Sequence, residues 1–433
     1  MILLMVACSE PDPLSISEAE TLWITDLSYE VSEAIPTAIK IRFTTAEEGW
    51  SWVEVDGVAT GQTSPNINHE HIIYGAPLQD LTVVVVAESD GERHESEEFT
   101  VTTGQLLPET PTLEVTVDAL SGKSHLQDAV LVAHLYGDPT SWTLITNMEG
   151  QVIWAMSQDS QGLGVIPALD RGGLMENIFH GKETHSASLR GLNLMGEVLV
   201  EIPTPGAHHF FDLVDGEPLW LRSDSRRVDA QMVTGDAIVW GDTEIFSTWD
   251  HLTHTPVGSS PFSVGTQDWT HANWIQYDDD RDTLLLSLGH HNAIVELAMD
   301  GTPQRIMGAL DSDYTPDPGN DAFKFPHGVH WVGEEMVLMS TFDGLSEVRQ
   351  YEMDDDTMLM TRTWDFGADY GWQVYALGEA QQLWDGNMLV SWGSVGVVQV
   401  VGLDGEVLWE AHSGLGMFFT QVYLLETRFS PRP

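Results

Sequence analysis

Cysteine and basic residues are scarce in this chain, and both shortages exclude classes of protein. The 433 residues include one cysteine, Cys8, so no intrachain disulfide can form. Lysine and arginine together number 17 against 67 acidic residues, a formal net charge of -50 at pH 7. Nucleic acids and anionic membrane surfaces repel a protein of this charge, so neither is expected as a partner. Because the acidic residues are spread along the whole chain, we interpret them as a solvated surface rather than a binding site.

Long apolar runs and long helical patterns are also missing. Beyond the N-terminus no run reaches the roughly 18 apolar residues that span a bilayer. The signatures GxGxxG, P-loop, HExxH and GxSxG are absent, so nucleotide-binding, zinc-protease and serine-hydrolase functions have no support. The chain instead has 42% hydrophobic residues, 16 tryptophans and 39 glycines. This composition favours an all-β protein with a large core and many turns.

The first twelve residues read MILLMVACSEPD, an apolar run followed by a small residue and Cys8. This order resembles the end of a bacterial lipoprotein signal, in which the cysteine is lipidated, although the run is short and lacks a basic start. We therefore predict that residues 1–19 are a signal remnant and tether that carries a lipid on Cys8. The protein would then lie in the cell envelope, periplasmic or anchored to the outer membrane, and meet the membrane only through that lipid. An apolar N-terminus without such a role is the alternative.

Two domains are expected after this segment. Residues 20–105 contain short alternating strands, such as AIKIRFT at Ala38–Thr44 and LTVVVVA at Leu81–Ala87, separated by polar turns. Their spacing predicts a β-sandwich of the fibronectin-III or immunoglobulin type. The sequence PETP at 108–111 indicates a linker, and residues 112–427 form the second domain.

The second domain contains an internal repeat of a strand, a tight acidic or glycine turn, and a strand that often ends in tryptophan. Its copies are Asn147–Trp154, Leu194–Ile202, Ala298–Ile306, Tyr351–Trp364, Gly402–Trp409 and a degenerate one near Glu244–Trp249. The intervals of about 45 to 56 residues are typical of propeller blades, each a four-stranded sheet. The repeat therefore predicts a six-bladed β-propeller.

Three segments of the propeller place histidine among large apolar residues just before a strand-like run. They read AHHFFDL at Ala207–Leu213, DWTHAN at Asp268–Asn273 and FPHGVH at Phe325–His330. A propeller gathers the inner ends of its blades around one channel, so these segments are expected to converge. The candidate residues are His208, His209, His271, Asn273, His290, His291, His327 and His330. Imidazole can act as a base, acid, nucleophile or metal ligand, whereas a lone histidine beside an aromatic ring is more often a satisfied core residue.

Metal binding is a further hypothesis for these histidines, as in a metal-dependent hydrolase. The segment Asp311–Asp321, DSDYTPDPGND, also has carboxylates that suit Ca²⁺, but it lacks the spacing of an EF-hand loop. We assign no metal site from the sequence.

Four segments resemble motifs of the bacterial arylsulfotransferase family, in the same order. The core is DWTHANWIQYDDDRDTLLLSLGHHNAIVELAMDG from Asp268, and the others are AHHFFDLVDG from Ala207, FKFPHGVHWVGEEMVLMSTFDG from Phe323 and EAQQLWDGNMLVSWGSVGVVQVVGLDGEVLWE from Glu379. The resemblance implies an exported six-bladed propeller, often preceded by a β-sandwich. It also implies transfer of a sulfuryl group from a phenolic sulfate ester to a phenol through a sulfated histidine, with no nucleotide or other cofactor.

The resemblance assigns roles by position. His327 corresponds to the nucleophile, His271 and Asn273 to the groups that bind the sulfate oxygens, and His209, or else His208, to a supporting histidine. The chain departs from the family at Gly289, where the family has an arginine that clamps the sulfate, and at Pro326, where it often has glutamine. His290 or His291 could replace the arginine if protonated or suitably placed. A non-catalytic propeller that binds a ligand or a protein is therefore the alternative to the sulfotransferase.

Overall fold

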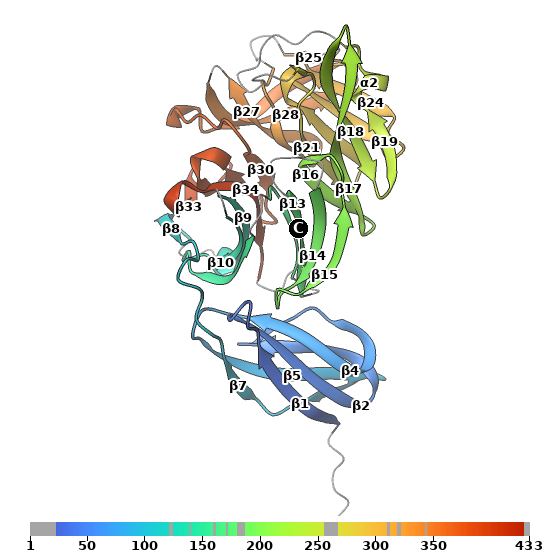
Figure 1. The fold of residues 1–433 in the computed structure, drawn as a ribbon. Helices are drawn as coiled ribbons and strands as arrows, with labels where there is room; N and C mark the ends of the chain where they lie inside the picture. The colour runs from blue at the N-terminus through green and yellow to red at the C-terminus, as the bar shows by residue number, and fades with distance from the viewer. Residues whose placement is uncertain are drawn as a thin grey trace, which may run out of the picture.

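The computed structural model describes residues 23–120, 124–137, 140–158, 162–169, 172–179, 187–254, 267–309, 312–317, 322–342 and 344–427. Cys8, the rest of the predicted tether and much of Asp311–Asp321 lie outside these residues. The described chain is almost entirely β-structure, in a curled N-terminal sheet and six propeller blades (Figure 1). The predicted all-β class and six-bladed propeller are confirmed.

The N-terminal sheet is built around one long strand that belongs to both of its halves. Its strands are β1 (Ile24–Val31), β2 (Ala38–Val55), β3 (Val58–Ala59), β4 (Thr63–Tyr74), β5 (Asp80–Ser89), β6 (Glu92–Glu95) and β7 (Phe99–Thr102). The first half of β2 pairs with β1 and β4, and its second half pairs with β5. At Gly49, between the halves, an added Cβ would lie 2.6 Å from the carbonyl oxygen of Glu88. The curl brings the apolar faces of both halves into one core, which is compatible with the predicted sandwich.

Each propeller blade is a sheet whose first strand lies nearest the axis. From the inside outward, blade 1 is β34 (Phe418–Leu425), β9 (Val130–Tyr136), β10 (Ser141–Asn147) and β11 (Val152–Gln158); blade 2 is β12 (Val165–Ala168), β13 (Gly173–Phe179), β14 (Ala187–Asn193) and β15 (Val198–Pro203); blade 3 is β16 (Ala207–Val214), β17 (Glu217–Val228), β18 (Gln231–Trp240) and β19 (Thr243–Ser247). The short strand β20 (Gln267–Asp268) pairs in parallel with β18.

The remaining blades follow the same order. Blade 4 is β21 (Ala272–Asp278), β22 (Thr283–Leu288), β23 (Ala293–Ala298) and β24 (Pro303–Gly308); blade 5 is β26 (His327–Val332), β27 (Glu335–Phe342), β28 (Leu345–Asp354), β29 (Leu359–Phe366) and β25 (Thr315–Pro316); blade 6 is β30 (Glu379–Gln382), β31 (Met388–Ser391), β32 (Val397–Val401), β33 (Val407–Ser413) and β8 (Leu113–Asp118). Short helices lie in the connections: α1 (Ser124–Gln127), α2 (Thr248–His251), η3 (Gly289–His291), η4 (Ala368–Tyr370), η5 (Gly393–Val395) and η6 (Gly414–Gly416).

Both ends of the propeller domain help to close the ring. The C-terminal strand β34 is the innermost strand of blade 1, and the N-terminal strand β8 is the outermost strand of blade 6. The innermost strands meet around the axis, as in the contacts of β16 with β21, β21 with β26 and β26 with β30. Five of the six predicted copies connect the third and fourth strands of a blade, which is why they recur at the blade period. The degenerate copy near Glu244–Trp249 instead lies in the fourth strand of blade 3, β19, and in the helix α2 that follows it.

The N-terminal sheet packs against the edge of blades 1 and 2, beneath them in Figure 1. One apolar cluster contains Ile35 and Ile39 of the sheet together with Trp154 of β11 and Leu194 after β14. The Ser32 hydroxyl donates to the Met195 carbonyl oxygen at 2.8 Å. The described residues include no helix that is long and apolar enough to cross a membrane.

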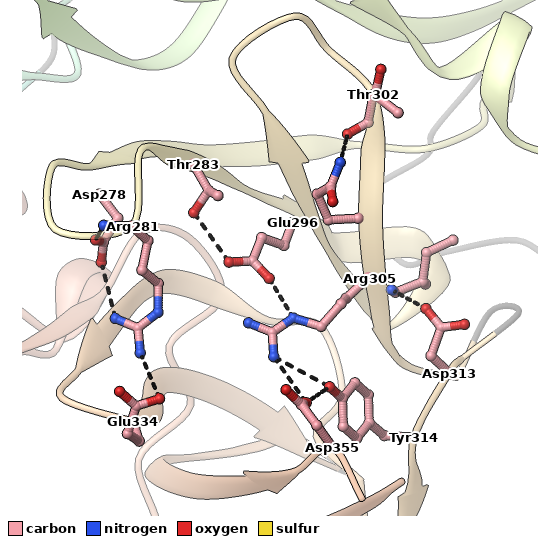
Figure 2. A network of polar contacts seen from close by, with 12 residues as sticks. Asp278, Arg281, Thr283, Glu296, Thr302, Arg305, Asp313, Tyr314, Glu334 and Asp355 are labelled. Carbon is pink, nitrogen blue, oxygen red and sulfur yellow. Dashed lines mark hydrogen bonds and ion pairs between the residues drawn. The ribbon is translucent and has the colours of Figure 1, made fainter.

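Two arginines join blade 4 to blade 5 (Figure 2). Arg305 of β24 pairs with Glu296 of β23 at 2.5 Å and with Asp355 of blade 5 at 3.2 Å. Arg281, in the β21–β22 turn, pairs with Glu334 of blade 5 at 3.3 Å. The guanidinium carbons lie 5.2 Å and 4.5 Å from the ring centre of Trp331, within the range of cation–π attraction.

Candidate functional site

Three neighbouring innermost strands begin with a β-bulge, and each bulge carries or adjoins a candidate histidine. The register against the second strand shifts between Ala207 and Phe211, between Ala272 and Trp274, and between His327 and His330. His209 and His271 adopt φ values of 56° and 50°, and Gly328 adopts 58°. Left-handed backbone is uncommon for a residue with a side chain and concentrates at functional sites. The bulges re-aim these side chains, so the three histidine segments converge as the repeat predicts.

Four of the predicted histidines form a continuous row from blade 3 to blade 4. The Nδ1 atoms of His208 and His209 lie 2.8 Å apart. The ring of His209 meets that of His271 edge-on at 5.1 Å between centres, and His271 stacks on His290 at 4.6 Å. Residues 63 positions apart in the sequence, His208 and His271, are thus linked through a single imidazole.

A carboxylate lies at the blade 4 end of this row. Nδ1 of His271 lies 2.6 Å from a carboxylate oxygen of Asp268 and donates to it, and the other oxygen of that carboxylate accepts the backbone N–H of His271 at 3.1 Å. Burial alone would raise the pKa of Asp268, but the hydrogen bond and charge of His271 outweigh it and lower that pKa. Nδ1 of His290 donates to the Asp268 carbonyl oxygen at 2.8 Å. Asp268 therefore fixes the orientation of both rings.

A second carboxylate, Asp236 of β18, lies at the blade 3 end. Its Oδ1 is 3.0 Å from Nε2 of His208, and its Oδ2 accepts the backbone N–H of Ala272 at 2.7 Å. The Asp236 side chain is almost fully buried. Asp236 is not among the site residues predicted from the sequence. An isolated aspartate in the otherwise apolar alternation of GDAIVW was the signal available.

His327 is held in one tautomer by the backbone of blade 6. Its Nδ1 lies 2.8 Å from the Gly378 carbonyl oxygen, which can only accept, so Nδ1 carries the proton and Nε2 carries the lone pair. Burial lowers the pKa of His327 to about 3, although the hydrogen bond to Gly378 opposes the shift. The pKa of His209 is also lowered, first by burial and then by the charges of His208, His271 and His327. Both rings are thus neutral near pH 7.

Asn273 connects blade 4 to the segment that carries His327. Its Nδ2 donates to the Pro326 carbonyl oxygen at 3.0 Å, and its Oδ1 accepts from the Ser287 hydroxyl. Ser287 also donates to the Pro326 carbonyl oxygen, at 3.1 Å. These bonds position Pro326, the residue before His327. Asn273 can offer the second N–H of its amide to an anion.

The space in front of Gly289 is occupied by protein. An added Cβ would lie 3.0 Å from Nδ2 of Asn273, 3.2 Å from the Phe325 ring and 3.3 Å from the His271 ring. Phe325 itself adopts a φ of 44°, and its N–H donates to the Asn292 side chain at 2.8 Å. Phe325 therefore lies in the region into which a side chain at position 289 would extend.

His291 and His330 have different surroundings from the row. His291 is buried and packs edge-on against Trp269 at 5.8 Å between ring centres. His330 lies 5.3 Å from the Trp274 ring and 3.8 Å from Glu379, a buried carboxyl whose pKa is raised by burial. His330 and Trp274 line a central cavity of about 590 Å³. The Trp274 ring also lies 5.7 Å from His327, so it contacts both His327 and this cavity.

Asp268, His271 and His290 are also close enough to share a metal ion, with one ligand atom of each within 4.8 Å of the others. In this structure both imidazoles use Nδ1 to bind Asp268, and their rings stack at an angle of 19°. Stacked rings direct their nitrogens side by side rather than toward one point. Binding an ion through both rings would therefore require at least one of them to turn.

The comparison with known proteins relates this arrangement to a family. Residues 114–314, a little under half of the chain, match the sequence model of the arylsulfotransferase (ASST) family. This segment is similar to the arylsulfotransferase family. The match runs from β8 to Tyr314 and so contains the row of histidines and both carboxylates, whereas His327 follows it in the same propeller.

Other comparisons add little to this similarity. No curated protein matches the chain. Among solved structures, a protein of unknown function from Bacteroides caccae is 12% identical, with a TM-score of 0.45 over 69% of this chain and 99% of that one. A functionally unknown protein from Desulfotomaculum acetoxidans is 13% identical, with a TM-score of 0.41 over 78% of this chain and 95% of that one. TM-scores below 0.5 support no argument about function.

Proposed function

We propose that this arylsulfotransferase-like propeller transfers a sulfuryl group from a phenolic sulfate ester to a phenol through a sulfated His327. The observation that carries the proposal is the bond from Nδ1 of His327 to the Gly378 carbonyl oxygen. It fixes the lone pair on Nε2, and the lowered pKa keeps that lone pair available at neutral pH. A neutral, oriented imidazole is the form in which histidine acts as a nucleophile.

The reaction has two displacements at sulfur. Nε2 of His327 attacks sulfur, the bond from sulfur to the aryl oxygen breaks, and a phenolate leaves. The oxygen of the acceptor phenol then attacks the same sulfur, and the nitrogen–sulfur bond breaks. His271 and the free N–H of Asn273 would stabilise the equatorial oxygens, and His209 would exchange a proton with the phenolic oxygen. No cofactor takes part in these steps.

The proposal includes the cell envelope as the site of action, with Cys8 as a lipid anchor. It rests on the order of residues in MILLMVACSEPD. Metabolic labelling with a fatty-acid analogue tests it: Cys8→Ala should remove the label from protein expressed in a bacterial host that processes lipoproteins.

Turnover of 4-nitrophenyl sulfate with phenol as acceptor tests the reaction. Wild-type protein should release nitrophenol, and His327→Ala should abolish the release. His412→Ala, in blade 6, is the control, because its side chain is 38% exposed and pairs with Glu410. Mass spectrometry of protein quenched without acceptor should find one added SO₃ group on the peptide that contains His327. Absence of turnover across several donors and acceptors would leave the non-catalytic binding propeller as the better hypothesis.

The cluster of Asp268, His271 and His290 makes a metal-dependent hydrolase the second candidate. Metal analysis separates the two functions. The sulfotransferase proposal expects no stoichiometric metal in the purified protein and unchanged turnover after dialysis against a chelator. One bound ion per chain, together with loss of activity on chelation, would favour the hydrolase.

A further inference from the structure

We propose that Asp236, His208 and His209 form a proton relay that serves the phenolic oxygen in both half-reactions. The relay would extend the substrates to sulfates of non-activated phenols, whose phenolates are poor leaving groups. This inference rests on the proposed sulfuryl transfer. It assigns a positioning and proton-holding role to Asp236 and His208, which touch His209 rather than the reacting atoms.

The contacts along the relay are short and buried. Oδ1 of Asp236 is 3.0 Å from Nε2 of His208, and Nδ1 of His208 is 2.8 Å from Nδ1 of His209. The side chain of Asp236 is 4% exposed and that of His208 is 14% exposed. The other oxygen of Asp236 accepts from the Thr270 hydroxyl and from the Ala272 N–H at 2.7 Å. Blade 4 thus holds the carboxylate in the orientation that faces His208.

Hydrogen-bond chemistry allows two states of this chain. Oδ1 of Asp236 lies 3.0 Å from Nε2 of His208 as an ion pair, without the geometry of a hydrogen bond. The negative charge of the carboxylate favours a proton on Nε2 of His208. The contact between the two Nδ1 atoms needs one proton, which belongs either to His208 or to His209. If it belongs to His208, that ring is an imidazolium opposite Asp236 and His209 carries its proton on Nε2. If it belongs to His209, both rings are neutral and Nε2 of His209 carries a lone pair.

The two states balance the two half-reactions. When the donor ester cleaves, Nε2 of His209 gives its proton to the departing phenolate oxygen, and the Nδ1 proton of His208 moves to His209. When the acceptor binds, its hydroxyl proton passes to Nε2 of His209, and the Nδ1 proton returns to His208 as the phenolic oxygen attacks sulfur. His209 is neutral in both states, which agrees with the lowering of its pKa by burial.

The dependence on the leaving group tests the relay. In a two-displacement transfer, kcat/KM for the donor reports only the first half-reaction, so activation of the acceptor does not affect it. Asp236→Asn should lower kcat/KM for phenyl sulfate by about 100-fold, within the usual range for general acid catalysis. The kcat/KM for 4-nitrophenyl sulfate should change by less than about threefold, because nitrophenolate leaves without a proton. His208→Gln should show the same selective loss. An equal loss with both donors would overturn the relay, because a merely structural role slows every donor alike.

Asp212→Asn is the matched control. Asp212 is a buried carboxylate of β16 that accepts the Tyr277 N–H of β21 at 2.9 Å, so it bridges the same two blades as Asp236. Its substitution should affect the two donors equally.

A spectroscopic measurement tests the relay without turnover. In ¹⁵N-labelled wild-type protein, the Nδ1 atoms of His208 and His209 should show a scalar coupling through their shared proton. Asp236→Asn should weaken that coupling. A missing coupling in the folded wild type would overturn the relay. If the coupling is present but no sulfate ester is turned over, the proposed function fails while the hydrogen-bonded chain stands.

Discussion

At the scale of single residues, burial decides what each histidine can do. His327 and His209 are surrounded by rings and backbone, and burial lowers the pKa of each, so both are neutral at pH 7. His271 differs because it pairs with Asp268 at 2.6 Å. His208 likewise lies 3.0 Å from Asp236. The site therefore combines neutral imidazoles, suited to nucleophilic and proton-transfer chemistry, with two imidazoles held beside carboxylates.

Gly289 offers a prediction about the filled space at the site. Gly289→Ala should lower the free energy of unfolding by about 1–3 kcal/mol, because its Cβ would press on Asn273, Phe325 and His271. Chemical denaturation measures the change. Gly414→Ala is the control, because the nearest atom to its added Cβ is 3.4 Å away and the effect should be near zero. Equal stability of Gly289→Ala and wild type would show that the site has room for a side chain there.

His134 offers a prediction about pH. It is fully buried in β9, its Nδ1 bonds the Thr420 hydroxyl at 2.9 Å, and burial lowers its pKa to about 4. The unfolded chain takes up a proton on this ring below about pH 6.5, whereas the folded protein does not until about pH 4. The contribution of neutral His134 to the free energy of unfolding is thus fully present above pH 6.5 and is lost as the pH falls toward 4.

Chemical denaturation between pH 4.5 and 6 tests this contribution of His134 to stability. In that range, His134→Gln should reduce the slope of stability against pH by about 1.4 kcal/mol per pH unit, the equivalent of one proton. The slope is compared within each protein, so any change in overall stability from the substitution does not affect the result. An unchanged slope would mean that His134 takes up its proton in the folded state.

At the scale of elements, the inner and outer strands of a blade contribute differently to the protein. The bulges that begin β16, β21 and β26 direct histidines toward the site, while the turns between third and fourth strands repeat around the outside. Contacts between blades hold the bulges in register with one another. Arg305 is one of these contacts, since it joins buried Glu296 of blade 4 to Asp355 of blade 5 (Figure 2).

Arg305→Met should lower the free energy of unfolding by about 3 kcal/mol, because it leaves the buried carboxylate of Glu296 without its cation. Arg281→Met is the matched control. Arg281 also lies over Trp331, but Glu334, its partner in blade 5, is 96% exposed, so the loss should be about 1 kcal/mol or less. Thermal and chemical denaturation measure both variants. Similar losses would indicate that stacking on Trp331, rather than the buried pair, holds the blades together.

At the scale of the whole molecule, the net charge of -50 opposes compaction. Like charges on a folded surface repel one another more than on an extended chain, and salt screens that repulsion. The ring closure by β8 and β34 resists it, because both ends of the propeller domain are paired within blades.

The melting temperature should therefore rise by several degrees between about 20 mM and about 300 mM NaCl, and then level off as the Debye length becomes shorter than the charge spacing. Differential scanning calorimetry checks this, and glucose at equal osmolality is the control for general solute effects. A melting temperature that stays constant or falls with salt would contradict net repulsion.

Local patterns made the blades predictable from the sequence. Each repeated turn joins two neighbouring strands, so its signal lies within a few residues and survives without knowledge of the rest of the fold. DWTHAN and FPHGVH were recognisable because each groups its histidine with aromatic residues before a strand. The convergence of their histidines followed from the propeller itself, since innermost strands share one axis.

Other parts of the site depend on contacts between distant segments. Asp236 reaches His208 only because β16 and β18 belong to one blade, and it reaches Ala272 only because the next blade packs beside it. Phe325, which fills the space in front of Gly289, is 36 positions away from it in the sequence. The tautomer of His327 depends on a carbonyl in blade 6, and a backbone carbonyl has no signature in the sequence.

The sequence by itself determined the all-β class, the number of blades and the segments that carry the histidines, because periodic turns and apolar alternation are local properties. Only the tertiary structure decided which nitrogens bear protons, which carboxylates orient them and what occupies the position of the missing arginine. Those properties come from burial and from hydrogen bonds between blades, and both arise only when the ring closes.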